Sequence, residues 1–136
     1  MKIEDIKNLW LIAQHAADIA AQDVSFADTQ RAVAEHVLAD CKQGVAKEAH
    51  RAQSVGILGS LTIWYRAAAC RIHDLGLEVA ERAAQAASAR ESLHAAMIEM
   101  KRVETIAAEF EGARRAEAAR KAQQELDEVA LRRWRA

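Results

Sequence analysis

Apolar and small residues recur at alternating spacings of three and four along most of this sequence. One run comprises Ile3, Ile6, Trp10, Ala13, Ala17, Ala20, Val24, Ala27, Ala34, Leu38, Cys41 and Val45, interrupted only by Arg31. A second comprises Leu61, Tyr65, Ala68, Ile72, Leu75, Val79, Ala86, Ala89, Leu93, Ala96, Met100, Val103, Ala107 and Phe110, interrupted by Arg82. Each run covers about six or seven heptads, more than a coiled coil needs. We therefore predict two long helices, each with an apolar stripe that we call its seam.

The two runs are separated by a segment with several residues that break helices. Residues 53–60 contain Ser54, Gly56, Gly59 and Ser60, whereas the chain contains no proline that could end a helix elsewhere. Helices joined by so short a connection run antiparallel. The prediction is an all-α fold, with a single domain over residues 1–136 that forms an antiparallel two-helix coiled-coil hairpin. Its first helix covers about 2–52, the turn about 53–60 and the longer second helix about 61–135.

A turn centred near residues 56 and 57 also predicts the register of the two helices. Facing residues then have numbers that add up to about 113, so that Ile3 meets Phe110 and Leu38 meets Leu75. Beyond Phe110 the second helix has nothing to pair with, and residues 111–125 contain no large apolar side chain. This stretch should form a solvated single helix.

The two arginines that interrupt the seams fall on the same predicted layer. Two cations so close would repel each other. We expect them to reach outward along their long stems toward carboxylates at Asp28, Glu35, Glu78 or Glu81. A polar layer can fix the register of a coiled coil, a role that we favour over ligand binding.

Two groups of large side chains could anchor a partner. Leu126, Val129, Leu131 and Trp134 have nothing to pack against within the hairpin, which indicates either a partner site or a frayed helix end. Trp64 should point partly outward, while Tyr65 should face the seam. An outward tryptophan is either a protein anchor or a cover for the turn.

The sequence offers no motif for catalysis or cofactor binding. Its five histidines are scattered, and it has neither a zinc motif nor a glycine-rich phosphate loop. We therefore predict no catalytic residue, no cofactor, no metal and no enzymatic activity. The net charge of -1 comes from 19 basic and 20 acidic residues spread along the chain, which disfavours nucleic-acid binding. Neither a signal peptide nor a membrane span is recognisable, and Cys41 and Cys70 have the character of free thiols, so we expect a cytoplasmic protein without direct membrane insertion.

The chain resembles the flagellar FliJ family, coiled-coil stalk proteins of the flagellar type III export apparatus. The resemblance lies in the two-helix architecture, in Ile6-Lys7-Asn8-Leu9 before the first seam, and in Glu125-Leu126-Asp127-Glu128-Val129-Ala130 near the carboxyl end. It implies a non-enzymatic stalk, similar to the central stalk of rotary ATPases, at the cytoplasmic face of the membrane-embedded export apparatus. The implied partners are a hexameric export ATPase, the cytoplasmic domain of the export gate and export chaperones.

The resemblance also implies two binding surfaces. The ATPase-facing set comprises Ile3, Ile6, Leu9, Leu126, Asp127, Glu128, Val129 and Arg133. The gate-facing set comprises Leu38, Cys41, Val45, Trp64, Ala68 and Leu75. The pattern of the family that this chain resembles has tyrosines before the turn, whereas this chain has Cys41 and Val45 there. Within the gate-facing set, only Trp64 is aromatic. The alternative function is a generic coiled-coil scaffold or an export chaperone for helical or unfolded clients.

Overall fold

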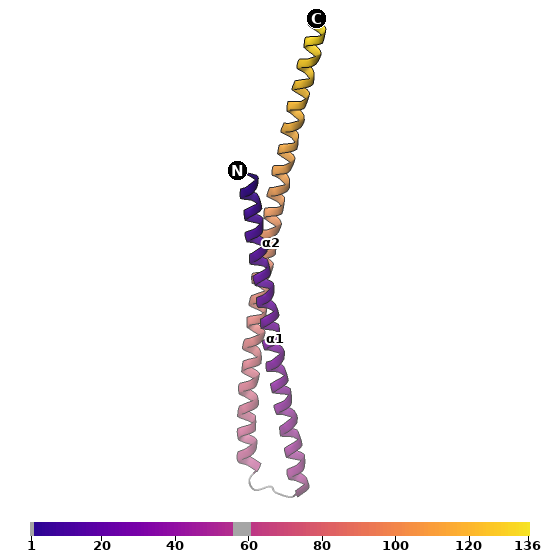
Figure 1. The fold of residues 1–136 in the computed structure, drawn as a ribbon. Coiled ribbons are helices and arrows are strands. Elements are labelled where there is room, and N and C mark those ends of the chain that lie inside the picture. Colours follow the sequence, from indigo (N-terminus) through magenta and orange to yellow (C-terminus); the bar gives the residue numbers. More distant parts are fainter. Residues whose placement is uncertain (1, 56–60) are drawn as a thin grey trace. The chain divides into compact units, whose positions relative to one another are not determined.

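The protein folds into two long helices, as the heptad spacing predicts. A computed structural model describes residues 2–55 and 61–136, in which α1 covers Ile3–Val55 and α2 covers Leu61–Arg135 (Figure 1). These ranges contain no strand, so the fold is all-α and the second helix is the longer one. α1 ends three residues later than predicted. The turn expected at about 53–60 therefore falls partly within α1 and otherwise outside the described residues.

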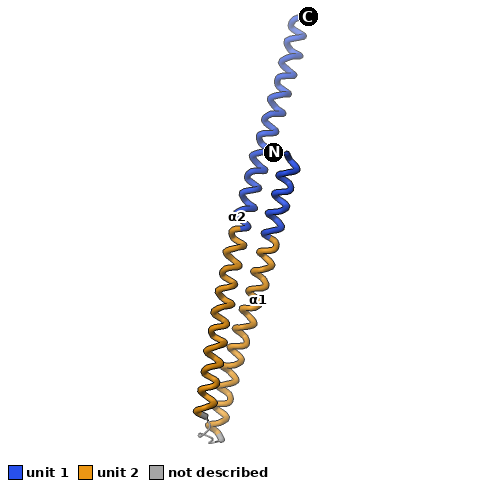
Figure 2. Tube along the Cα trace, turned by 90° about the vertical axis from the view of Figure 1, so that its left-hand side faces the viewer, with its two compact units in different colours: residues 1–17, 96–136 blue, residues 18–95 orange. Residues whose placement is uncertain are grey.

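The chain divides into two compact units, each an antiparallel pair of segments from α1 and α2. Unit 1 combines residues 1–17 with residues 96–136, and unit 2 comprises residues 18–95 (Figure 2). Each unit thus contains a part of both seams. The helices pair through the stripe that the heptads define.

In unit 2, small residues form the most buried part of the seam. Ala20, Ala34 and Ala86 are buried, and Ala86 is 0% exposed. Larger seam residues such as Leu38 and Leu75 are only half-buried. Since the transfer free energy follows the apolar area removed from water, at about 25 cal/mol per Å², these alanine layers add little stability each.

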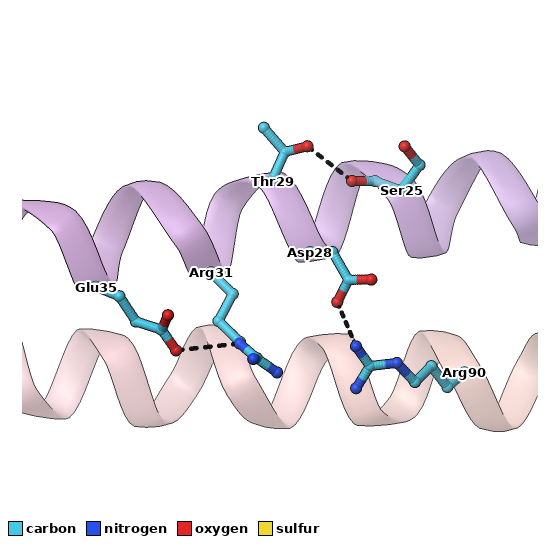
Figure 3. A network of polar contacts seen from close by, with 6 residues as sticks. All are labelled: Ser25, Asp28, Thr29, Arg31, Glu35 and Arg90. Carbon is cyan, nitrogen blue, oxygen red and sulfur yellow. Dashed lines mark hydrogen bonds and ion pairs between the residues drawn. The ribbon is translucent and has the colours of Figure 1, made fainter.

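One ion pair joins the two helices of unit 2 across a flank of the seam. The guanidinium Nη2 of Arg90 donates a hydrogen bond to Oδ1 of Asp28 at 2.6 Å (Figure 3). The predicted register places Asp28 level with residue 85, five positions from Arg90. Helical side chains lean toward the amino terminus of their own helix, so in an antiparallel pair these two lean toward each other. The contact therefore agrees with the predicted register.

The seam arginines behave largely as expected. Arg31 is half-buried, and its Nε donates to Oε1 of Glu35 at 3.1 Å (Figure 3). Arg82 is also half-buried, but its Nη1 donates to the amide oxygen of Gln85 at 3.3 Å, so the expectation of Glu78 or Glu81 is wrong for this residue. Gln85 lies three positions further along the helix, where side chains of one helix face meet.

Tyr65 is the seam position that the burial contradicts. Its side chain is exposed, whereas the neighbouring Trp64, expected to point partly outward, is half-buried. In a helix with 3.6 residues per turn, Trp64 lies about 40° from the half-buried Ala68 around the axis, and Tyr65 about 60° on the other side. The prediction that Tyr65 faces the seam is therefore wrong, whereas the half-burial of Trp64 agrees with a side chain that points partly outward.

In unit 1, pairing stops where the sequence predicts. Ile6, Ala13, Ala17 and Val103 are buried, and Phe110 is half-buried. Ile6 and Trp10 line one shallow groove together with Ala107, the residue predicted to face Ile6. Every residue from 111 to 136 is exposed. The last part of α2 is therefore a helix without an intramolecular partner in the described residues.

Candidate partner-binding surfaces

The exposed end of α2 carries four large apolar side chains, which we call the C-terminal cluster. They are Leu126, Val129, Leu131 and Trp134, and the indole of Trp134 is 84% exposed. Spacings of three separate Leu126 from Val129 and Leu131 from Trp134, so each pair shares a helix face. Soluble proteins rarely leave such neighbouring apolar groups in water without a partner.

Charged residues surround the C-terminal cluster. Asp127 accepts a hydrogen bond at 3.0 Å from the side-chain amide of Gln123, one turn earlier. Arg132, Arg133 and Arg135 lie in the last turn of α2. Cations at a helix carboxyl end interact favourably with its dipole, so these arginines stabilise the turn that presents Trp134.

Ion pairs within the helix support the solvated stretch before the cluster. Arg115 lies 3.5 Å from Glu111. Arg120 donates two hydrogen bonds to Glu117, at 3.1 and 2.6 Å. These hydrogen bonds lower the pKa of Glu117 and raise the pKa of Arg120. Pairs at three- and four-residue spacing stabilise a helix that has no tertiary packing.

The ATPase-facing set divides into two groups that lie apart along unit 1. Ile3 is half-buried and Ile6 is buried in the seam, whereas Leu9 is exposed. Leu126, Asp127, Glu128, Val129 and Arg133 are all exposed. Ile6 faces Ala107, and 19 residues of helix from there to Leu126 correspond to roughly 28 Å at 1.5 Å per residue. The structure does not bring the two groups of residues together. The group near the end of α2 is the more accessible to a partner.

The gate-facing set lies along the seam of unit 2. Leu38, Cys41, Val45, Trp64, Ala68 and Leu75 are all half-buried. The rings of Trp64 and Tyr65 meet edge to face, with centroids 5.2 Å apart. Half-buried seam residues offer a partner only part of their surface. More accessible apolar groups nearby are Ile63, Tyr65 and Leu77, which are exposed.

A second apolar stripe on α1 was missed by the sequence analysis. Within unit 2 it consists of Ile19, Phe26, Val33 and Val37, all exposed, and we call it the outer row. Its signal was present in the sequence, because the first three residues follow one another at intervals of seven.

The described residues hold no arrangement typical of a metal site or a membrane span. In residues 2–55 and 61–136, no three side chains of His, Cys, Asp or Glu come close enough to hold a metal ion together. Over the same ranges, no helix has the length and apolarity needed to cross a bilayer. Cys41 is half-buried and Cys70 is exposed, and both are free thiols.

Fold and exposed side chains together describe an all-α coiled-coil hairpin with apolar surfaces outside its seam. No protein-family model, no curated protein and no solved structure matches the chain.

Proposed function

We propose that this protein is a non-enzymatic stalk of the flagellar protein export apparatus that engages the hexameric export ATPase through the end of α2. The observation that carries the proposal is the C-terminal cluster, four exposed apolar side chains on an unpartnered helix. This cluster includes Leu126 and Val129 of the element that resembles the FliJ family. The same proposal assigns the gate domain and export chaperones as further partners, and the cytoplasmic face of the export apparatus as the location.

The energy of such a contact requires charges as well as apolar groups. Fully burying the four cluster side chains contributes roughly 1.5–3 kcal/mol each, or roughly 6–12 kcal/mol in all. Association costs about 4–15 kcal/mol in lost translational and rotational freedom. These ranges overlap, so the cluster alone gives weak binding at best. Asp127, Glu128 and Arg133, which lie among the cluster residues, would add charged contacts and orient the helix in its site.

A single helix within a ring of six subunits suggests a mechanism. One helix end presents different side chains in different directions, with acidic, basic and apolar groups interspersed around the helix. Ring subunits in contact with different faces therefore experience different interactions. A contact that favours one subunit conformation shifts the population of that conformation, and this differential binding is sufficient to promote ring assembly or ATP turnover.

The experiment that tests the proposal removes the cluster while leaving both units paired. Deletion of residues 123–136 should abolish stimulation of the export ATPase, measured as its rate of ATP hydrolysis. Far-UV circular dichroism should lose only the helical signal of the deleted residues. The double variant Leu126→Ser and Trp134→Ser should act like the deletion, whereas Ala119→Ser with Ala122→Ser, on the same exposed helix, should leave stimulation unchanged.

Two outcomes would count against the stalk. Full stimulation by the deleted protein would reject the assignment of the α2 end to the ATPase. If the deleted protein failed to stimulate the ATPase but still captured helical or unfolded client proteins as fully as the complete chain, the alternative of a generic scaffold or export chaperone would gain support. The exposed apolar residues of unit 2 are the surfaces that this alternative would use.

A further inference from the structure

The outer row is a second heptad stripe on a helix that already uses one stripe for pairing. Ile19, Phe26 and Val33 each follow a seam position of α1 by two residues, and Val37 lies four residues beyond Val33. Two residues correspond to about 200° around a helix, so the row and the seam point in different directions. The row side chains are between 40% and 66% exposed, although the seam is covered by α2.

We propose that the outer row is the docking site for an amphipathic α-helix of another protein, which carries apolar residues at heptad spacing and a basic residue opposite Asp23. This proposal is independent of the ATPase contact, since it concerns a different unit and different residues. The period of the row supports a helix as the occupant, because side chains at intervals of seven lie along one stripe of α1, and a second helix can pack along such a stripe. From Ile19 to Val37 the row spans 18 residues, or roughly 27 Å, the length of a helix of about five turns.

The charge within the row selects the kind of partner. Asp23 lies four residues after Ile19 and three before Phe26, and therefore on the row itself. Two other carboxylates of this part of α1 are already paired, Asp28 with Arg90 and Glu35 with Arg31. Among the described residues, no cation lies within ion-pair distance of Asp23. The apolar residues of a docked helix would partly desolvate the carboxylate of Asp23. A lysine or arginine of that helix at the same level would neutralise its charge.

A second copy of this chain fits the row less well. In a parallel pair, Asp23 would meet Asp23 of the other copy, which places two like charges side by side. In the antiparallel pair that sets Ile19 opposite Val37, Asp23 would face Val33 and lose water without gaining a partner. An anionic membrane surface is also a poor occupant, since helices that bind it carry lysine and arginine beside their apolar face. A different protein with a basic residue avoids each of these penalties.

The test uses a fluorescent helical peptide of about 21 residues, with leucines at heptad positions and one lysine among them, and the full chain as its target. Binding is measured by fluorescence anisotropy. Phe26→Ser should weaken binding by at least about tenfold, as expected for a central aromatic anchor. Leu77→Ser is the matched control, an exposed apolar residue of the same unit outside the row, and it should change binding by less than about twofold.

A charge reversal tests the assignment to Asp23. Replacement of the peptide lysine by glutamate should weaken binding, and Asp23→Lys in the protein should restore binding of the glutamate peptide. Phe26→Ala is a second variant at this position, chosen because alanine is a strong helix former and keeps α1 folded. Circular dichroism of this variant should show unchanged helicity. Equal affinities for the lysine and glutamate peptides would overturn the proposal, as would equal effects of Phe26→Ser and Leu77→Ser. Sedimentation equilibrium that reveals a dimer lost in Phe26→Ser would instead assign the row to a second copy.

Discussion

Replacing Ile6 by alanine should destabilise unit 1 by about 2 kcal/mol. The Ile6 side chain is 6% exposed and lies in the seam near Ala107. The substitution removes three carbon groups, each contributing about 0.8 kcal/mol when buried, or about 2.4 kcal/mol in all. Alanine is the better helix former by up to about 0.5 kcal/mol, which offsets part of this loss. The seam is open at its edges, so the neighbouring side chains can move inward and we expect little additional penalty from a cavity.

Ile12→Ala provides the control, because the same residue type on the same helix is 67% exposed. At Ile12, about a third of the transfer free energy of the removed carbon groups is lost, and the higher helix propensity of alanine offsets most of it. The free energy of unfolding should therefore fall by less than about 0.5 kcal/mol. Urea unfolding followed by circular dichroism at 222 nm measures both variants. Equal shifts of the two midpoints would refute the claim that Ile6 stabilises the protein through the seam.

Three further predictions concern single contacts. Gly76→Ala should raise the stability by about 0.5–1 kcal/mol in the same urea assay, since a Cβ at this helical position meets nothing within 4 Å and alanine favours the helix. Arg120→Gln should raise the pKa of Glu117 back toward its ordinary value, as measured by carboxyl NMR titration. Because the folded-state pKa of Glu117 is lowered, its contribution to helicity is present at neutral pH and lost as the pH falls through that pKa. A double-mutant cycle on Asp28 and Arg90 should give a coupling of about 0.2–1 kcal/mol, as expected for an exposed pair.

The sequence predicted the fold closely because the relevant signal is local and repeated. Every seam residue of α1 from Ile3 to Val45 is buried or half-buried. In α2 the same holds from Ala68 to Phe110, while Tyr65 is exposed. A heptad pattern averages over many turns, so the register tolerates single deviations. The choice between Trp64 and Tyr65 depends on the twist of one turn, which the averaged pattern does not resolve.

The candidate surfaces were harder to predict than the fold. The exposed end of α2 followed from the loss of large apolar residues after Phe110, and the structure places the C-terminal cluster there as expected. The outer row is visible in the sequence only as intervals of seven among Ile19, Phe26 and Val33, and this spacing does not show that the side chains stay exposed. Partner identity depends on shape and charge in a second molecule, for which heptad spacing carries no information. In the gate-facing set, the spacing already places Leu38, Cys41, Val45, Ala68 and Leu75 on the seams, whereas the half-burial of Trp64 is seen only in the structure.

The distribution of large side chains connects the weak seam to the exposed surfaces. Among the residues that the structure describes, five of the seven buried core residues are alanines, and the other two are Ile6 and Val103. Phe26, Leu126 and Trp134, by contrast, lie outside the seam and are exposed. Alanines allow two helices to approach closely but supply little transfer free energy, whereas exposed aromatic and leucine side chains supply it only when a partner covers them. A large part of the hydrophobic stabilisation that these side chains can supply is therefore not gained within the described part of the chain, and would be gained only where a partner covers them.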